Sequence, residues 1–231
     1  MPQKQENSPT SSAKLNNHLA SMLASVQEAI ETLKRLLHEN LPSRSLIETY
    51  RPHEQWFRRP EEIGGIHGIN HEARVMIWQE LLARLLINDG MTLDQEALRW
   101  AAATHDTQRL TDGADFPHGE RAAAWVKQQL RQTIPERTLE TVAYLNTWHV
   151  PSDSYAPRMT SELAVFKDAD GLDRVRLYDL ETKYLRWEYS KTLLVPLAQA
   201  LFELSEKEKQ AGVRNFDCVM KAAIQLGLIT Q

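Results

Sequence analysis

The sequence lacks the features that mark disulfide-rich and membrane-spanning proteins. Its single cysteine, Cys218, excludes an internal disulfide framework and any zinc module built from several cysteines. No segment approaches the roughly 18 consecutive apolar residues of a membrane span, and Arg84 interrupts the longest apolar stretch, residues 81–87. The first residues show no signal-peptide pattern. We therefore expect a cytoplasmic protein with a reduced cysteine and no membrane partner.

An excess of positive charge is also lacking. The 231 residues include 27 Lys and Arg against 31 Asp and Glu, which gives a formal net charge of −4 at pH 7. This balance argues against a polybasic nucleic-acid binder. Residues 51–60 do combine arginines with Trp56 and Phe57, a mixture that can stack on nucleic acid. We interpret that segment as a structural connector, so a nucleic-acid partner is not expected.

No stretch sustains the two-residue alternation of a half-buried strand, and neither an Asn-Gly hairpin nor an internal repeat occurs. Apolar residues recur instead at helical spacing in nearly every segment. We predict an all-α fold with a loose tail (1–12), an N-terminal helical arm (13–43) and one helical domain (44–231). The expected helices cover residues 14–39, 66–87, 92–104, 117–132, 135–148, 161–209 with Gly171 as a candidate break, and 215–228.

The eight histidines are unevenly spaced, and five of them lie on the apolar faces of predicted helices. Two aspartates share this placement, and most of the set falls near a helix end. The set consists of His67 and His71 four residues apart in 66–87, His105 and Asp106 at the end of 92–104, His118 at the start of 117–132, His149 after 135–148, and Asp170 in line with Leu163 and Phe166.

Imidazole and carboxylate groups that converge from facing helices suit a divalent metal ion. Coordination positions left open by the protein hold water, whose pKa the metal lowers, and the metal also polarises a phosphoryl oxygen. We therefore predict one or two divalent ions per chain, with Mn, Fe, Co, Ni or Zn favoured and Mg compatible.

Three strings, HEARV (71–75), THD (104–106) and KDADGLD (167–173), resemble in this order the H…HD…D pattern of the HD-domain superfamily of metal-dependent phosphohydrolases. The resemblance covers about residues 60–190 and implies an HD-domain-like helical bundle. It implies a phosphomonoesterase or phosphodiesterase that hydrolyses a nucleotide or related small phosphoester by attack of a metal-bound hydroxide. The metal ligands that it implies are His71, His105, Asp106 and Asp170.

Two further histidines extend the resemblance. The string PHGERAA (117–123) resembles the segment that supplies an additional histidine in two-metal members such as the HD-GYP phosphodiesterases, and His149 falls where those proteins carry a further ligand. His118 and His149 are therefore candidate ligands of a second metal. Single-metal relatives use the same positions to contact phosphate, so both are also candidate substrate contacts. A GYP string is lacking, so cyclic-di-GMP is not assigned as substrate.

Other residues are candidates for contact with the phosphoester. Arg109 follows Asp106 by three residues and matches the lysine in one form of the family's motif, a position that resembles a phosphate contact. The guanidinium of Arg109 could hold two phosphate oxygens. Arg174 could reach the phosphate or form a solvated ion pair. His118 could stabilise phosphoryl charge, and His67 could protonate the leaving oxygen or orient a water molecule.

Two other functions fit the same residues. Some HD proteins, such as inositol oxygenase, resemble di-iron oxygenases with the same ligand order. A non-catalytic regulatory module that binds a metal or nucleotide is the other alternative. The N-terminal helix carries apolar residues at helical spacing, so it could pair with another copy of the chain to form a homo-oligomer.

Overall fold

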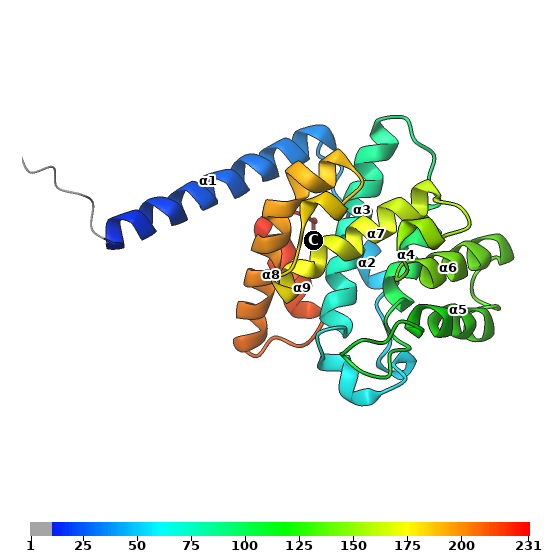
Figure 1. Ribbon diagram of the computed structural model, residues 1–231. Coiled ribbons are helices and arrows are strands. Elements are labelled where there is room, and N and C mark those ends of the chain that lie inside the picture. Colours follow the sequence, from blue (N-terminus) through cyan, green and yellow to red (C-terminus); the bar gives the residue numbers. More distant parts are fainter. Residues whose placement is uncertain (1–10) are drawn as a thin grey trace, which may run out of the picture.

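The computed structural model describes residues 11–231, with side chains described from residue 24 onward, and its regular structure is helical. Within those residues the only pairing of extended backbone is a single bridge between Ser43 and Thr230. The predicted all-α class is therefore confirmed (Figure 1). The α-helices are α1 (Ser11–Leu36), α2 (Arg44–Thr49), α3 (Ile69–Asn88), α4 (Gln95–Thr104), α5 (His118–Gln129), α6 (Glu136–Trp148), α7 (Ser161–Leu172), α8 (Val195–Gln210) and α9 (Asp217–Leu226).

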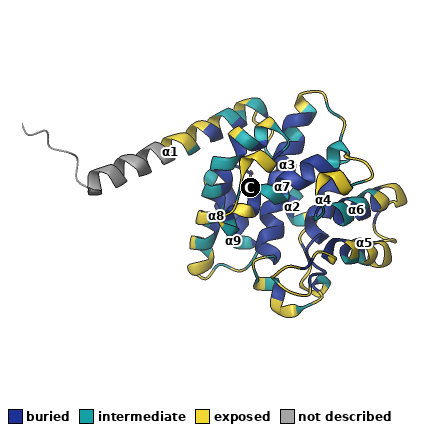
Figure 2. Ribbon diagram, viewed as in Figure 1, coloured by how far each residue is buried: buried dark blue, intermediate teal, exposed yellow. Residues whose placement is uncertain are grey.

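Helix α3 lies at the centre of the bundle. Nearly all of its residues are buried, as Figure 2 shows, and it packs against α4, α7 and α9. Burial on all sides explains why its sequence is apolar on more than one face. Helix α4 packs in turn against α6, and α6 packs against α5. The helices that carry the candidate ligands are therefore direct neighbours.

Local sequence determines where several of these helices begin. Asp94 and Thr160 cap α4 and α7 with side-chain oxygens that accept from backbone N–H groups three residues later, at 3.0 and 3.1 Å. Gly68 precedes α3, and a Cβ atom there would lie 2.3 Å from the carbonyl oxygen of Ile63. Only glycine allows the chain of the short helix η2 (Pro60–Gly64) to approach the start of α3 this closely.

The structure corrects two of the predicted helices. The predicted helix 66–87 begins only at Ile69, so His67 precedes the helix instead of lying on its face. The predicted helix 161–209 breaks directly after its candidate break at Gly171, because α7 ends at Leu172, but the break is long: residues 173–189, here called the strap, separate α7 from the later helices. The strap contains two 3-10 turns, η4 (Asp173–Leu177) and η5 (Thr182–Tyr184), and leads into a π-helical segment, η6 (Ser190–Leu194), that continues as α8.

A buried carboxylate explains why the strap does not continue α7 as a helix. Asp168, in α7, is fully buried and accepts the backbone N–H groups of Arg186 and Trp187 at 2.8 to 2.9 Å. Those N–H groups are thereby satisfied without helix formation. Tyr178 adopts a left-handed backbone conformation with φ of 58°, which ends η4. Gly171 lies inside α7, so the break comes after it.

The N-terminal region divides into described and undescribed parts. Residues 1–10 of the predicted tail lie outside the described residues, and residues 11 and 12 belong to α1. Ile30, Leu33 and Leu37 are buried in the core, and α1 packs against α8. None of the helices between residues 11 and 231 is both long and apolar enough to cross a membrane.

The connector between α1 and α3 packs on the body through aromatic and backbone contacts. It contains α2 and a 3-10 turn, η1 (Glu54–Trp56). The Trp56 ring lies 6.2 Å from that of Trp100 and 5.6 Å from that of Trp125. The Arg58 N–H donates to the Thr107 carbonyl at 2.8 Å. These contacts hold the basic and aromatic segment against the end of α4, next to the candidate ligands.

Candidate metal centre

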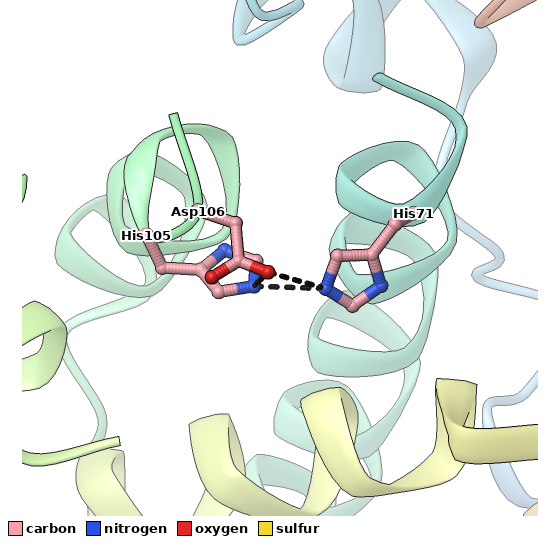
Figure 3. A group of neighbouring side chains, drawn as sticks. All are labelled: His71, His105 and Asp106. Atoms are coloured by element: carbon pink, nitrogen blue, oxygen red, sulfur yellow. Dashed lines mark hydrogen bonds and ion pairs between the residues drawn. The ribbon is translucent and has the colours of Figure 1, made fainter. Parts of the chain in front are cut away.

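The predicted ligands meet at one place in the bundle. Helix α3 contributes its first turn, α4 and α6 contribute the residues just after their last turns, α5 contributes its first residue, and α7 contributes its last turn. All of the side chains except Asp170 are buried, and Asp170 is 29 % exposed. Figure 3 shows three of them facing one another. The six residues are His71, His105, Asp106, His118, His149 and Asp170.

The first ligand group consists of His71, His105, Asp106 and Asp170. The two imidazole Nε2 atoms lie 3.1 Å apart. The Nε2 atom of His71 lies 3.5 Å from Oδ2 of Asp106 and 3.4 Å from Oδ1 of Asp170. Ligands of one ion at metal–ligand distances of about 2.1 Å are separated by about 3.0 to 3.4 Å in octahedral or tetrahedral geometry. The Nε2 atom of His105 lies 3.9 Å from both Oδ2 of Asp106 and Oδ1 of Asp170, so the first group could hold a single divalent ion after small shifts of these side chains.

The second ligand group consists of Asp106, His118 and His149. The Nε2 atoms of His118 and His149 lie 2.9 Å apart. Oδ1 of Asp106 lies 2.8 Å from Nε2 of His118 and 3.8 Å from that of His149. Each group includes ligand atoms that all lie within 4.8 Å of one another. Asp106 therefore presents one oxygen to each group, the arrangement of a carboxylate that bridges two ions.

The Nδ1 atom of each imidazole is held by an oxygen that can accept a hydrogen bond. Such an acceptor retains the proton on Nδ1 and leaves the lone pair on Nε2. The four acceptors are Asp173 Oδ2 for His71 at 2.7 Å, the Ala102 carbonyl for His105 at 3.2 Å, the Asp115 carbonyl for His118 at 2.5 Å, and the Asn146 carbonyl for His149 at 2.7 Å.

The orientation of the four Nε2 lone pairs shows whether a metal ion would fit between these residues. Each ligand group holds a pair of Nε2 atoms whose lone pairs face each other at about the closest distance two nitrogens can approach. Two acceptors at such a distance repel unless a metal ion or a shared proton lies between them. A divalent ion satisfies both lone pairs in each pair, together with the carboxylate oxygens that face them. The residues present therefore fit the group that the sequence predicts.

The electrostatic setting favours neutral imidazole in one group more than in the other. Burial lowers the pKa of His105 to about 3. Burial also opposes the charge of Asp106, but the surrounding histidines hold the pKa of that carboxyl well below its usual range. For His118, burial is outweighed by Asp106, and the pKa is raised. A metal in the second group must therefore compete with a proton on His118.

A glycine brings the two histidines of the second group together. Gly119 follows His118 in the first turn of α5. A Cβ atom at this position would lie 2.3 Å from the Asn146 carbonyl oxygen and 3.2 Å from Cε1 of His149. The start of α5 can approach the end of α6 only because this side chain is absent. The sequence PHGE (117–120) thus contains both the candidate ligand His118 and the glycine that allows it to approach His149.

The pair of residues that orients His71 was not predicted from the sequence. Asp173 is fully buried, and Nε of Arg74 donates to its Oδ1 at 2.5 Å while its Oδ2 accepts from His71. Burial opposes the charge of Asp173, but Arg74 outweighs it, and the pKa of this carboxyl lies below its usual range. Sequence spacing could have identified this pair, because Arg74 follows His71 by three residues and Asp173 follows Asp170 by three residues.

Glu72 was also missed. It follows His71, is fully buried, and neither of its carboxylate oxygens has a hydrogen-bond partner among the described residues. Burial raises its pKa well above the ordinary value. Burial therefore disfavours the charged form of the Glu72 carboxyl group.

A cavity of about 310 Å³, here called cavity 1, opens beside both ligand groups. Arg109 lines it and donates to the Gly113 and Thr111 carbonyls at 2.7 and 3.2 Å, with Nη1 lying 3.4 Å from Oδ1 of Asp106. Arg176, which the sequence analysis did not single out, lines it too and donates to the Ile66 carbonyl at 2.8 Å. Nη1 of Arg176 also lies 3.4 Å from Oδ2 of Asp173. Each arginine is thus held by carbonyl oxygens and reaches a carboxylate only at 3.4 Å.

Two other predicted contacts also line cavity 1. Arg174 is half exposed and forms an ion pair with Asp179, so its charge is already compensated. His67 lies before α3, with Nδ1 3.0 Å from Oδ1 of Asp112. Burial lowers the pKa of His67 to about 4, which leaves the imidazole neutral at neutral pH. Of the two predicted roles for His67, this favours orientation of water over protonation of a leaving group.

Comparison of this chain with protein-family models, curated proteins and solved structures found no match.

Proposed function

We propose that this protein is a metal-dependent phosphohydrolase that acts on a small phosphoester, of which a nucleotide is the expected example. One observation supports this most strongly. Four histidines, each anchored through Nδ1, direct their Nε2 lone pairs at two positions that share the Asp106 carboxylate. The two positions border a cavity lined by Arg109 and Arg176, whose guanidinium groups are held mainly by carbonyl oxygens.

In this proposal the ions occupy the two ligand groups. His71, His105, Asp106 and Asp170 would hold one divalent ion, and Asp106, His118 and His149 a second. When bound, such ions lower the pKa of coordinated water and polarise a phosphoryl oxygen. Nitrogen and oxygen ligands suit Mn, Fe, Co, Ni or Zn.

The protein's own side chains hold and orient the substrate. Arg109 and Arg176 present guanidinium groups to cavity 1, where they would pair with phosphoryl oxygens. Because carbonyl oxygens already hold both groups, little ordering is needed when the anion binds. Neutral His67 is held by Asp112, and its Nε2 atom can accept a hydrogen bond from water at the cavity wall.

The test combines metal analysis with hydrolysis. We expect about two divalent ions per chain in the purified protein and release of inorganic phosphate from phosphoesters. Asp106→Asn replaces the shared oxygen donor, so it should lower metal content at both positions and phosphate release by at least a hundredfold. The control is Asp89→Asn, because Asp89 is an exposed aspartate at the far end of α3.

Three results would contradict the proposal. Undiminished phosphate release by the Asp106→Asn protein would show that the ligand groups are not catalytic. Oxygen consumption by an iron-loaded protein, without phosphate release, would favour the oxygenase alternative. A metal-loaded protein that binds nucleotides but never hydrolyses a phosphoester would favour the regulatory alternative.

A further inference from the structure

A second cavity borders the candidate ligands His149 and Asp170. Its volume is about 610 Å³, within the range of roughly 300–1,000 Å³ typical of small-molecule sites. The chain after α6, helix α7 and the strap form its walls. This cavity 2 shares His149, Val150, Asp170 and Arg174 with cavity 1. A ligand bound between the two ligand groups could therefore extend into both cavities.

The cations that line cavity 2 are all compensated. Four cationic and four carboxylate side chains line it. Lys167 lies 2.9 Å from Asp153, and Lys183 lies 2.5 Å from Glu181. The other two cations are paired in the same way: Arg174 contacts Asp179, and Arg186 contacts both Asp153 and the buried Asp168.

Cavity 1 differs in this respect. The guanidinium groups of Arg109 and Arg176 are held mainly by carbonyl oxygens. The carboxylates that they also reach, Asp106 and Asp173, lie at 3.4 Å, and Asp173 is already bound by Arg74 at 2.5 Å. The cations in cavity 1 are therefore less closely compensated than those in cavity 2, where an additional anion would have to displace an existing partner. The phosphoryl group of a substrate belongs in cavity 1, and an uncharged group belongs in cavity 2.

The remaining lining of cavity 2 indicates the chemistry of that uncharged group. Leu180, Leu185 and Pro151 offer apolar surface, and Tyr184 offers an aromatic ring that is 65 % exposed. Such surface suits the face of a planar ring. The carboxylates of the ion pairs have lone pairs left over, and these can accept hydrogen bonds from hydroxyl groups.

We propose that cavity 2 binds the uncharged organic part of a phosphomonoester, a group of nucleoside size with a planar ring and hydroxyl groups. The assignment of the phosphoryl group to cavity 1 rests on the proposed function. Such a cavity would select nucleoside monophosphate-like substrates over molecules that carry a second phosphate on the organic part.

Binding of uncharged nucleosides tests the cavity directly. Metal-loaded, full-length protein is titrated calorimetrically with the four ribonucleosides, which carry no phosphate. We expect saturable binding of at least one of them. Ser152→Trp introduces an indole on an exposed residue that lines cavity 2, and it should weaken that binding at least tenfold.

Ser154→Trp is the matched control. Ser154 lies two residues further along the same exposed segment and does not line the cavity, so nucleoside binding should match that of the unmodified protein. Absence of nucleoside binding to the unmodified protein, or equal binding by the two tryptophan variants, would overturn the proposal.

A second titration tests the exclusion of charge. A nucleoside 3′,5′-bisphosphate should bind no more tightly than the 5′-monophosphate, because one of its two phosphates must enter cavity 2. Tenfold tighter binding of the bisphosphate would also overturn the proposal. Neither titration depends on turnover, so failure of the proposed hydrolase activity would appear separately, as absence of phosphate release from a protein that still binds nucleosides.

Discussion

The two ligand groups share Asp106 but differ in charge and in anchoring. The first group has a second carboxylate, Asp170, and a third, Asp173, behind His71. The second group has only the shared carboxylate, and its histidines are anchored by carbonyl oxygens. Nη1 of Arg109 also lies 3.4 Å from the oxygen that Asp106 presents to the second group.

Two positions with similar ligand spacing therefore need not bind a cation equally well. Negative charge around an ion raises its affinity, and a neighbouring cation or a competing proton lowers it. We therefore expect stepwise filling, in which the first group binds its ion more tightly than the second. Three variants test this order.

The largest effect should follow from His149→Ala. The change removes one of three protein ligands from the second group and leaves every ligand of the first group in place. We expect metal content to fall from about two ions per chain to about one. Isothermal titration of metal-free protein should then lose the weaker of two binding steps. Loss of the tighter step instead would reverse the assignment of affinities.

Asp173→Asn should weaken the first group. The amide cannot supply the charge that orients His71, and loss of such an outer partner typically costs about 10- to 100-fold in metal affinity. The tighter step of the titration should shift by that factor, with the weaker step unchanged. Equal shifts in both steps would show that the ligand groups do not differ in their anchoring.

The Asp173→Asn protein should also be less stable, because Arg74 loses its buried charged partner. We expect the free energy of unfolding, measured by urea titration at pH 7, to fall by about 3 kcal/mol. The depressed pKa of Asp173 gives this contribution a pH dependence. It is fully present above the unfolded-state pKa of about 4 and is lost as pH falls below that value toward the lower folded-state pKa. The Asp173→Asn protein lacks that part of the acid destabilisation.

The smallest of the three effects should come from Gly119→Ala. The new methyl group meets the Asn146 carbonyl oxygen, so α5 must shift from α6 at a cost of about 1–3 kcal/mol in stability. His118 moves with it, and the weaker binding step should shift about tenfold. Gly113→Ala is the control, because its nearest new contact is a flexible side chain, Thr111 Oγ1, at 3.6 Å. An unchanged weaker step in the Gly119→Ala protein would show that this glycine does not position His118.

Prediction from sequence succeeded where the deciding interactions are local. The helices that carry the ligands were found because apolar residues repeat every three to four positions, and ligands at helix ends follow from that register. His105 and His149 both lie directly after a helix, as predicted. The start of α3 was misplaced because the pattern continues through His67, whereas the contact between Gly68 and η2 delays the helix.

Prediction failed where the deciding partner is distant along the chain. The strap is non-helical because Asp168 accepts N–H groups 18 and 19 residues away. Arg176 faces cavity 1, and Arg174 pairs with Asp179, because η4 is a 3-10 turn rather than a continuation of α7. No periodicity in the sequence reports these contacts.

The sequence by itself determined that the chain is helical and that six nitrogen- and oxygen-bearing side chains lie near helix ends, because both follow from spacing along a single helix. Only the tertiary structure decided that Asp106 faces both groups, that Asp173 orients His71, and that cavity 2 has its charges paired. These features join residues from separate helices and loops, and their geometry depends on packing distances that one-dimensional patterns do not contain.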